Sequence, residues 1–500
     1  MPTWINTVKK VKRRPQRIVR NCMLTLLVII ITLQMSIVNV QLTTANSESL
    51  INRVSGLTVY DFTQDGIDDV VVVKYLVKDD WDSPVEYHSR LVLLDGRNGE
   101  TVQTYGAEGL GKTAIREVIP IPYGPEQTPA LLVIDASSLW LADGTALDGP
   151  PLWGPLTLSS RMTGAVVGDL FGNGSQVALV WAQWLYAIDI LSGKSLWTLK
   201  ELPKNLSHDR FGIVRFTQLD TDPMAELLTT TISKGPESYI LALDGENGHV
   251  RWAKPRSTLP SFESAGVFFA ADINQDAIQD IILVYEYNFT HQELVALDGK
   301  DRSLLWRVSG VFGTRWIDPS CLQDFNGDEM LELAIWERLP DNRVRPAMYN
   351  LTSGQMIWKN HSIQVYNQIG VALHPDSLPQ VISITNTTIT AVSGTTGIIQ
   401  WSASPLWSIS DLESASYSQL LAVGNFTGDR TLDIVVGHYW QGEVWMLDGL
   451  THEVRWHLPP VTTRLSTTKA TPIKFTAYVI VILACVRVVK RRNKQPIEIY

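Results

Sequence analysis

Short apolar runs separated by polar turns fill the chain from about residue 55 to residue 458. One phrase recurs, in which an apolar run leads into an Asp-Gly turn and a tryptophan follows eight residues after the aspartate, as in Asp244 to Trp252. The other full or near copies run from Asp189 to Trp197, Asp298 to Trp306, Asn350 to Trp358, Ser393 to Trp401 and Asp448 to Trp456. Weaker copies centre on Asp95, where Gln103 replaces the tryptophan, and on Asp143, where Trp153 lies two residues late.

The eight anchors of this phrase are separated by 48, 46, 55, 54, 52, 43 and 55 residues. A period of this length, with several short strands in each unit, is typical of a β-propeller rather than of a helical solenoid. We therefore predict an all-β propeller of eight four-stranded blades, with seven as the alternative because the copies near Asp143 and Ser393 are weak. The tryptophans are expected to fill the gaps between neighbouring blades.

A second phrase is acidic and precedes most of these units. Asp61 to Asp69 is followed at once by the β-branched run Val70–Val73, and oxygen-bearing side chains stand at positions 1, 3, 5 and 9 of the loop. Position 7 can add its carbonyl, and such oxygen ligation suits calcium. An EF-hand would need flanking helices, so we expect this loop to join two strands. The competing interpretation is a tight turn in which these side chains bond their own backbone without metal.

The acidic loops resemble the FG-GAP repeats of integrin α-chain propellers, and the Asp-Gly…Trp phrases resemble the tryptophan-docking repeats of quinoprotein-type propellers. The resemblance spans roughly residues 55 to 458. It implies structural calcium at four loops, with ligands Asp61, Thr63, Asp65 and Asp69; Asp272, Asn274, Asp276 and Asp280; Asp324, Asn326, Asp328 and Glu332; and Asn425, Thr427, Asp429 and Asp433.

Four repeats depart from the calcium pattern. Val177 takes position 9 of the loop that starts at Asp169, and the loop at Asp220 is shortened around Pro223. The acidic loop is missing altogether near Pro120–Pro129 and His374–Pro379. The sequence therefore gives no basis for metal in these four repeats.

The two ends of the chain indicate a membrane-tethered protein. Residues 1–45 combine a basic stretch with an apolar run from Met23, as in a signal anchor or a signal peptide cleaved before Asn46. After the propeller, predicted over 46–458, a Thr- and Pro-containing stalk covers 459–473. A predicted transmembrane anchor covers 474–489, and the basic tail 490–500 would lie in the cytoplasm. This topology places the propeller in an extracellular, periplasmic or lumenal compartment.

Charge and cysteine content narrow the possible partners. The region 46–473 holds 29 Lys and Arg against 50 Asp and Glu, a net charge of −21, which argues against nucleic acid. Cys321 is its single cysteine, so no disulfide can form within the propeller. Sequons would permit glycosylation in a eukaryotic host at Asn173, Asn205, Asn288, Asn350, Asn360, Asn386 and Asn425.

The sequence favours binding over catalysis. The quinoprotein resemblance implies a quinone held in a central funnel, often against a disulfide of adjacent cysteines, and this chain has no such pair. Gly106 to Thr113 matches the P-loop pattern, but Pro120, Pro122 and Pro125 forbid the long helix that a P-loop begins. We predict an adhesion or scaffolding module that binds a protein or glycan, with structural Ca2+ and no catalytic residue. The alternatives are a quinoprotein-like redox enzyme and an accessory subunit of an envelope or secretory complex.

Overall fold

The computed structural model describes residues 47–466 apart from 79–87, 106–114, 159–160, 204–205, 207–209, 233–238, 256–263, 289–290, 311, 313–317, 340–342, 364–366, 385–387, 405–418, 439–441 and 460–462. The chain divides into two compact units, one of residues 51–462 and one of residues 1–50 with 463–500. In the second unit, Ser47–Leu50 pairs antiparallel with strand β33 (Thr463–Ser466). The predicted terminal segments 1–45, 474–489 and 490–500, like most of the stalk, lie outside the described residues. Among the residues that are described, no helix has the length and apolar character needed to span a membrane.

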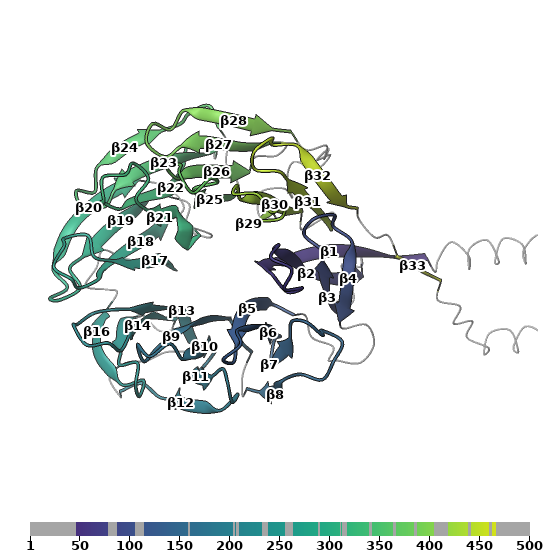
Figure 1. The fold of residues 1–500 in the computed structure, drawn as a ribbon. Helices are drawn as coiled ribbons and strands as arrows, with labels where there is room; N and C mark the ends of the chain where they lie inside the picture. The colour runs from purple at the N-terminus through teal and green to yellow at the C-terminus, as the bar shows by residue number, and fades with distance from the viewer. Residues whose placement is uncertain are drawn as a thin grey trace, which may run out of the picture. The chain divides into compact units, whose positions relative to one another are not determined.

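The unit 51–462 contains seven antiparallel four-stranded sheets and most of an eighth, in which β33 adds a fifth strand beside β1 of the four-stranded blade β1–β4; within each blade the strands follow one another in sequence order (Figure 1). This confirms the prediction of an eight-bladed propeller. The first four blades are blade 1, β1 (Ser47–Tyr60), β2 (Asp69–Lys78), β3 (His88–Leu94) and β4 (Thr101–Tyr105); blade 2, β5 (Glu117–Tyr123), β6 (Thr128–Ile134), β7 (Ser138–Asp143) and β8 (Trp153–Thr157); blade 3, β9 (Gly164–Asp169), β10 (Gln176–Trp181), β11 (Leu185–Asp189) and β12 (Ser195–Leu199); and blade 4, β13 (Arg210–Thr217), β14 (Glu226–Ile232), β15 (Tyr239–Leu243) and β16 (Val250–Pro255).

The remaining sheets follow the same plan, with one 3-10 turn, η2 (Pro319–Cys321), before β21. They are blade 5, β17 (Ser264–Ala271), β18 (Asp280–Asn288), β19 (His291–Leu297) and β20 (Leu304–Gly310); blade 6, β21 (Leu322–Gln323), β22 (Glu332–Arg338), β23 (Val344–Asn350) and β24 (Met356–Lys359); blade 7, β25 (Asn367–Val371), β26 (Gln380–Ile384), β27 (Ile389–Ser393) and β28 (Ile399–Ala403); and blade 8, β29 (Gln419–Gly424), β30 (Asp433–His438), β31 (Glu443–Leu447) and β32 (Val454–Leu458).

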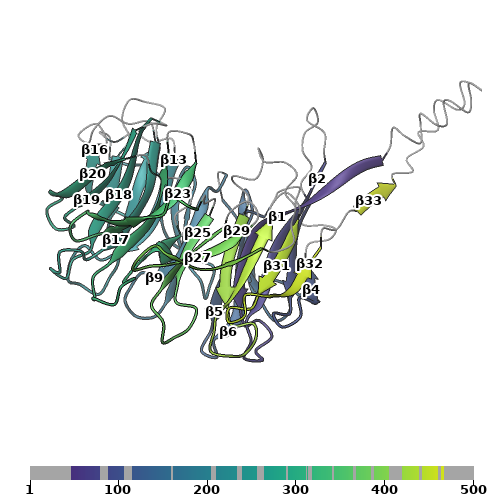
Figure 2. The same cartoon turned by 90° about the horizontal axis from the view of Figure 1, so that it is seen from above.

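The middle strands are apolar on both faces because each blade packs between two others. In β2, Val71 and Val73 belong to the core shared with blade 2, whereas Val70 and Val72 pack with Val435 of blade 8. All four valines of this run are at most 2% exposed. The packing of blade 8 on blade 1 closes the ring, and Figures 1 and 2 both place β31 and β32 beside β1 and β2. A strand buried on both sides is therefore an uninterrupted apolar run rather than an alternating one.

The repeated tryptophans join each blade to the next, as predicted. Each ring lies on the outer strand. Trp401 donates its indole N–H to Gln380 Oε1 of its own blade at 3.2 Å, whereas in five repeats the indole N–H donates to the carbonyl that directly follows the anchor residue of the next turn. These bonds are Trp153 to Ile190, 2.7 Å; Trp197 to Gly245, 2.9 Å; Trp306 to Leu351, 2.6 Å; Trp358 to Gly394, 2.6 Å; and Trp456 to Gly96, 2.7 Å.

The ring of the tryptophan covers the fourth residue after the anchor, which has a left-handed backbone. Five turns carry glycine there, with φ from 66° to 74°, and an added Cβ would lie 2.5–2.9 Å from a ring atom (Gly99, Gly193, Gly248, Gly354 and Gly397). Arg302 takes this place opposite Trp252, with its guanidinium carbon 5.6 Å from the ring centroid. His452 takes it opposite Trp401 and stacks on it at 4.1 Å.

The one repeat without a tryptophan is joined by an amide side chain. Gln103 of β4 donates from Nε2 to the Thr145 carbonyl and accepts the Leu147 N–H at Oε1, both at 2.6 Å. Gln103 thus bonds the Asp143 turn of blade 2 through both ends of its carboxamide. The weak copies of the sequence phrase therefore still form blade-to-blade contacts.

Candidate functional site

One face of the propeller collects both repeated phrases. Acidic loops connect the first strand of a blade to the second, and the Asp-Gly turns connect the third to the fourth. Because antiparallel strands alternate in direction, these two connections emerge at the same end of every blade. We call this end the loop–turn face; it comprises the connections between first and second strands and between third and fourth strands of all eight blades.

Hydrogen bonds link the loops of neighbouring blades on this face. Backbone N–H groups donate to carbonyls of the preceding blade from Asp68 to Asn425, 2.9 Å; Ala225 to Leu170, 3.0 Å; Gln279 to Gln218, 2.9 Å; and Leu432 to Leu373, 2.7 Å. Side chains reinforce two of these junctions, because Asp68 Oδ2 accepts the Asn425 N–H at 2.7 Å and Gln279 Oε1 accepts the Gln218 N–H at 3.0 Å. The loop–turn face is therefore a connected surface.

Position 9 of each predicted calcium loop is a buried carboxylate that holds the loop to its strand. Asp69, Asp280, Glu332 and Asp433 are at most 2% exposed. The three aspartates each accept an N–H from within the loop and the N–H of the glycine in their own blade's turn, as Asp433 does from Phe426 at 2.9 Å and Gly449 at 2.8 Å. Glu332 accepts the Phe325 N–H at 2.9 Å. Burial raises the pKa of all four groups, and these hydrogen bonds offset part of that rise.

Positions 1 and 5 accept backbone N–H groups from further along the loop in all four loops, and at position 3 Asn274 and Asn326 do the same. Asp61 accepts N–H groups from Asp65 at 3.1 Å and Gly66 at 2.9 Å, and Asp272 accepts from Asp276 and Ala277 at the same distances. In loops 324–332 and 425–433, position 1 again accepts N–H groups from further along its loop. Every position 5 carboxylate accepts the N–H of position 7, at 2.6–3.0 Å. In the three loops with carboxylates at positions 1, 5 and 9, one oxygen from each does not lie within 4.8 Å of the other two, so the structure places the predicted ligands in one loop without bringing them to a common centre.

These contacts test how well the loops fit a cation. The hydrogen bonds are those of Asx turns, which need no metal. An ionised carboxylate has about four lone-pair sites, so the one to three backbone amides at each carboxylate leave lone pairs that can still bind a hard cation. Side chains that each carry an oxygen, together with the position 7 carbonyl, are the donor types that calcium prefers. The donor types therefore suit calcium, while the carboxylate oxygens are not gathered around one centre, and calcium binding stays a prediction.

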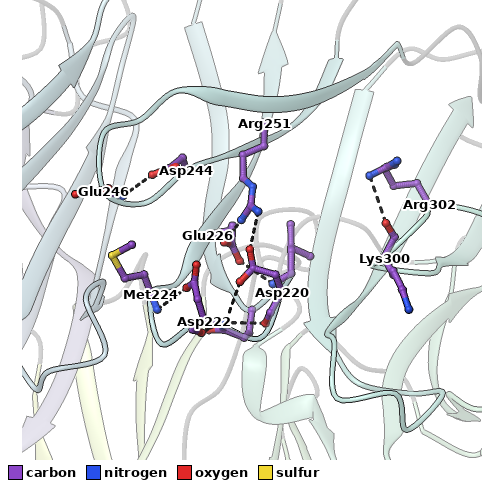
Figure 3. Close-up of polar contacts among 11 residues, drawn as sticks. Asp220, Asp222, Met224, Glu226, Asp244, Glu246, Arg251, Lys300 and Arg302 are labelled. Atoms are coloured by element: carbon purple, nitrogen blue, oxygen red, sulfur yellow. Dashed lines mark hydrogen bonds and ion pairs between the residues drawn. The ribbon is translucent and has the colours of Figure 1, made fainter.

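Blade 4 carries an acidic cluster that the sequence pattern did not single out (Figure 3). One carboxylate oxygen from each of Asp220, Asp222 and Glu226 lies within 4.8 Å of the others, the one such group of His, Cys, Asp or Glu among the described residues. Arg251 enters this cluster, donating to Asp220 Oδ2 at 2.6 Å and to Glu226 Oε1. The shortening around Pro223 hid the cluster, although its acids alternate at 220 and 222. The guanidinium already balances part of its charge.

Charged side chains of different blades also influence one another near the innermost strands, where Glu117 of β5 and Arg215 of β13 interact electrostatically. Glu117 of β5 accepts the Ala165 N–H at 3.1 Å, and burial raises its pKa against the opposing effects of this bond and of Arg215. Burial lowers the pKa of Arg215, a shift opposed by Glu117 and Asp318. Inner strands of alternate blades thus place charges of opposite sign within electrostatic range of one another.

Comparisons with known proteins find only distant structural similarities. No protein-family model and no curated protein matches the chain. Among solved structures, BamB from Moraxella catarrhalis is 14% identical over 73% of this chain and 93% of its own, with a TM-score of 0.37. The Dos1 propeller is 7% identical over 80% and 95%, with a TM-score of 0.48. The quinohemoprotein alcohol dehydrogenase from Comamonas testosteroni is 11% identical over 75% and 70%, with a TM-score of 0.44. Similarities this distant carry no argument about function.

Proposed function

We propose that this chain is a membrane-tethered, extracytoplasmic binding or scaffolding module whose loop–turn face contacts a protein partner. In this proposal the propeller is a calcium-stabilised relative of FG-GAP propellers. The terminal apolar segments hold it at the membrane, and no bond is made or broken in the partner.

The observation that carries the proposal is the way the loop–turn face uses its polar groups. The acidic side chains of its loops accept backbone N–H groups of the same blade, and loops of neighbouring blades are bonded to one another. Carboxylates that accept backbone N–H groups in this way have a structural role in ordering the surface, rather than a role as catalytic acids or bases. A surface that is ordered before it meets its partner loses little conformational entropy on binding, which favours affinity.

Calcium would strengthen this surface at the four predicted loops. The ion would be held by side-chain oxygens of positions 1, 3, 5 and 9 and the carbonyl of position 7. Its charge would offset the repulsion between carboxylates that lie close together, such as Asp65 and Asp69. The ion would thereby order each loop and contribute no catalytic step.

Site-directed photo-crosslinking in native membranes tests the proposal. A crosslinking amino acid is placed at exposed loop–turn positions, Gln64 and Glu126, and at the matched exposed outer-strand positions Arg307 and Lys359. We expect one and the same protein to be crosslinked from the loop–turn positions and not from the outer strands. Crosslinks confined to the outer strands would contradict the proposal. A purified chain that carries a quinone chromophore and oxidises alcohols would instead support the redox enzyme.

A further inference from the structure

A cleft opens on the loop–turn face where blade 1 meets blade 2. Its volume is about 460 Å³, and it is lined by Tyr60, Asp61, Gln64, Gly66, Asp68, Gln127 and Pro129. The first five residues belong to the end of β1 and the acidic loop of blade 1, and the last two to the β5–β6 hairpin of blade 2. The cleft exists because blade 2 has a short turn, residues 124–127, where other blades have a longer loop.

The cleft holds negative charge without a matching cation. Asp65, in the same loop, pairs with Arg97 at 2.9 Å, whereas neither Asp61 nor Asp68 forms an ion pair with any described residue. Asp68 Oδ2 accepts the Asn425 N–H at 2.7 Å, and its Oδ1 has no hydrogen-bond donor within the described part of the chain. Both carboxyl groups are half-buried, and Asp61 lies close enough to Asp68 to repel it. Two carboxylates in a partly desolvated cleft attract a cation more strongly than exposed ones do.

The other lining groups suit an organic cation. Tyr60 supplies an aromatic ring, whose face attracts ammonium and guanidinium groups. Gln127 is exposed at the tip of its turn and can accept a hydrogen bond through its carboxamide oxygen. A carboxylate, a ring and an amide acceptor together recognise the charge and the apolar stem of a basic side chain.

We propose that this cleft binds a lysine or arginine side chain of the protein partner. Asp68 is the principal counter-ion, Tyr60 contacts the cation and its stem, and Gln127 lies at the open edge. This inference rests on the proposed function, because it assigns a specific contact to the loop–turn face. It also agrees with the net charge of −21 in region 46–473, which favours basic partners.

Ligand-observed NMR on the full-length chain in detergent tests the cleft directly. The probes are acetylated tripeptides with a central lysine or arginine, and the matched neutral probes carry norleucine or citrulline. We expect the cationic peptides to bind and the neutral ones not to bind. Asp68→Asn, which can still accept the Asn425 N–H, is expected to weaken binding about tenfold or more because a charge-assisted bond is lost. Asp376→Asn, an acid exposed elsewhere on the same face, is the control and leaves binding unchanged.

A second variant protects the test against misfolding at Asp68. Gln127→Lys lies in an exposed turn and places a tethered ammonium at the cleft, so it is expected to abolish peptide binding. Because Asp61 also belongs to a predicted calcium loop, titrations are run in chelator and in calcium. Binding in calcium should be weaker, since the ion offsets the charge of Asp61, and should still depend on Asp68.

Equal binding of neutral and cationic peptides, or unchanged binding in Asp68→Asn and Gln127→Lys, overturns the proposal. Binding of methyl glycosides in place of the cations overturns it as well and identifies a sugar site. The two proposals fail separately. If the loop–turn face crosslinks a partner equally well in Gln127→Lys, the cleft is wrong and the function stands. If no partner is crosslinked there, the function is wrong whatever the peptides show.

Discussion

A single methyl group at Gly354 should reveal how much stability the docking tryptophans provide. Gly354 has φ 69°, and an added Cβ would lie 2.7 Å from Cδ2 and 2.8 Å from Cε3 of Trp306. Gly354→Ala therefore incurs about 1 kcal/mol for the left-handed backbone and roughly 1–3 kcal/mol for the overpacked ring. Displacing Trp306 also strains its 2.6 Å bond to the Leu351 carbonyl, which contributes about 0.5–1.5 kcal/mol. We expect a total loss of roughly 2.5–5.5 kcal/mol.

Gly124→Ala is the matched control for this experiment. Gly124 has φ 70°, almost the same as Gly354, but no atom lies within 4 Å of its added Cβ. It therefore reports the backbone cost alone, about 1 kcal/mol. Thermal melting of both full-length variants, followed by tryptophan fluorescence, should show a shift at least twice as large for Gly354→Ala. Equal shifts would refute the conclusion that Trp306 packs on this glycine in solution.

Three further predictions concern charge. Calcium at a hundredfold excess over its dissociation constant should stabilise the chain by about 2.7 kcal/mol per site. The double variant Asp272→Asn, Asp276→Asn should show a smaller calcium-induced rise in melting temperature. An unchanged rise would show that loop 272–280 does not bind calcium. Burial raises the pKa of Glu117 above its ordinary 4.5, so ionising this carboxyl group costs stability as the pH rises above 4.5. Glu117→Gln should therefore flatten the decline in melting temperature above pH 4.5, and an unaltered profile would contradict the assignment. Arg251→Met leaves the three acids Asp220, Asp222 and Glu226 without their cation and should lower the melting temperature more than Arg455→Met, because Arg455 pairs with one carboxylate. Equal decreases in melting temperature would show that the stability of the acidic cluster does not depend on Arg251.

The fold could be predicted from the sequence because each repeat carries its own anchor. The eight-residue step from anchor to tryptophan encodes a turn, a bulge and an outer strand, and both ends of that step form contacts between blades. The imperfect copies of the phrase also form contacts between blades, because Gln103 bonds the next turn through both ends of its amide and Trp153 donates to the Ile190 carbonyl. Local pattern and global packing therefore agree.

The loop–turn face was only partly predictable. The spacing of Asp272, Asn274 and Asp276 identified a ligand-like loop, but it did not show that Asp280 also bonds the Gly299 N–H in the turn of the same blade. The cluster at Asp220 was missed because its partner Arg251 is 31 residues away. The cleft beside Asp68 depends on how short the neighbouring hairpin is, a property of two blades at once. Contacts between distant segments of the chain are not encoded in the spacing of either segment.

Hydrogen–deuterium exchange tests most directly the claim that the loop–turn face binds a protein partner. Exchange is measured on the chain alone and on the chain mixed with the purified protein that the crosslinking experiment identifies. The account predicts that the partner slows exchange in peptides from the loops between first and second strands and the turns between third and fourth strands. Protection should be strongest around residues 60–68 and 124–129, where the cleft lies. Protection confined to the outer strands, or no change anywhere on the loop–turn face, would contradict a binding role for this surface.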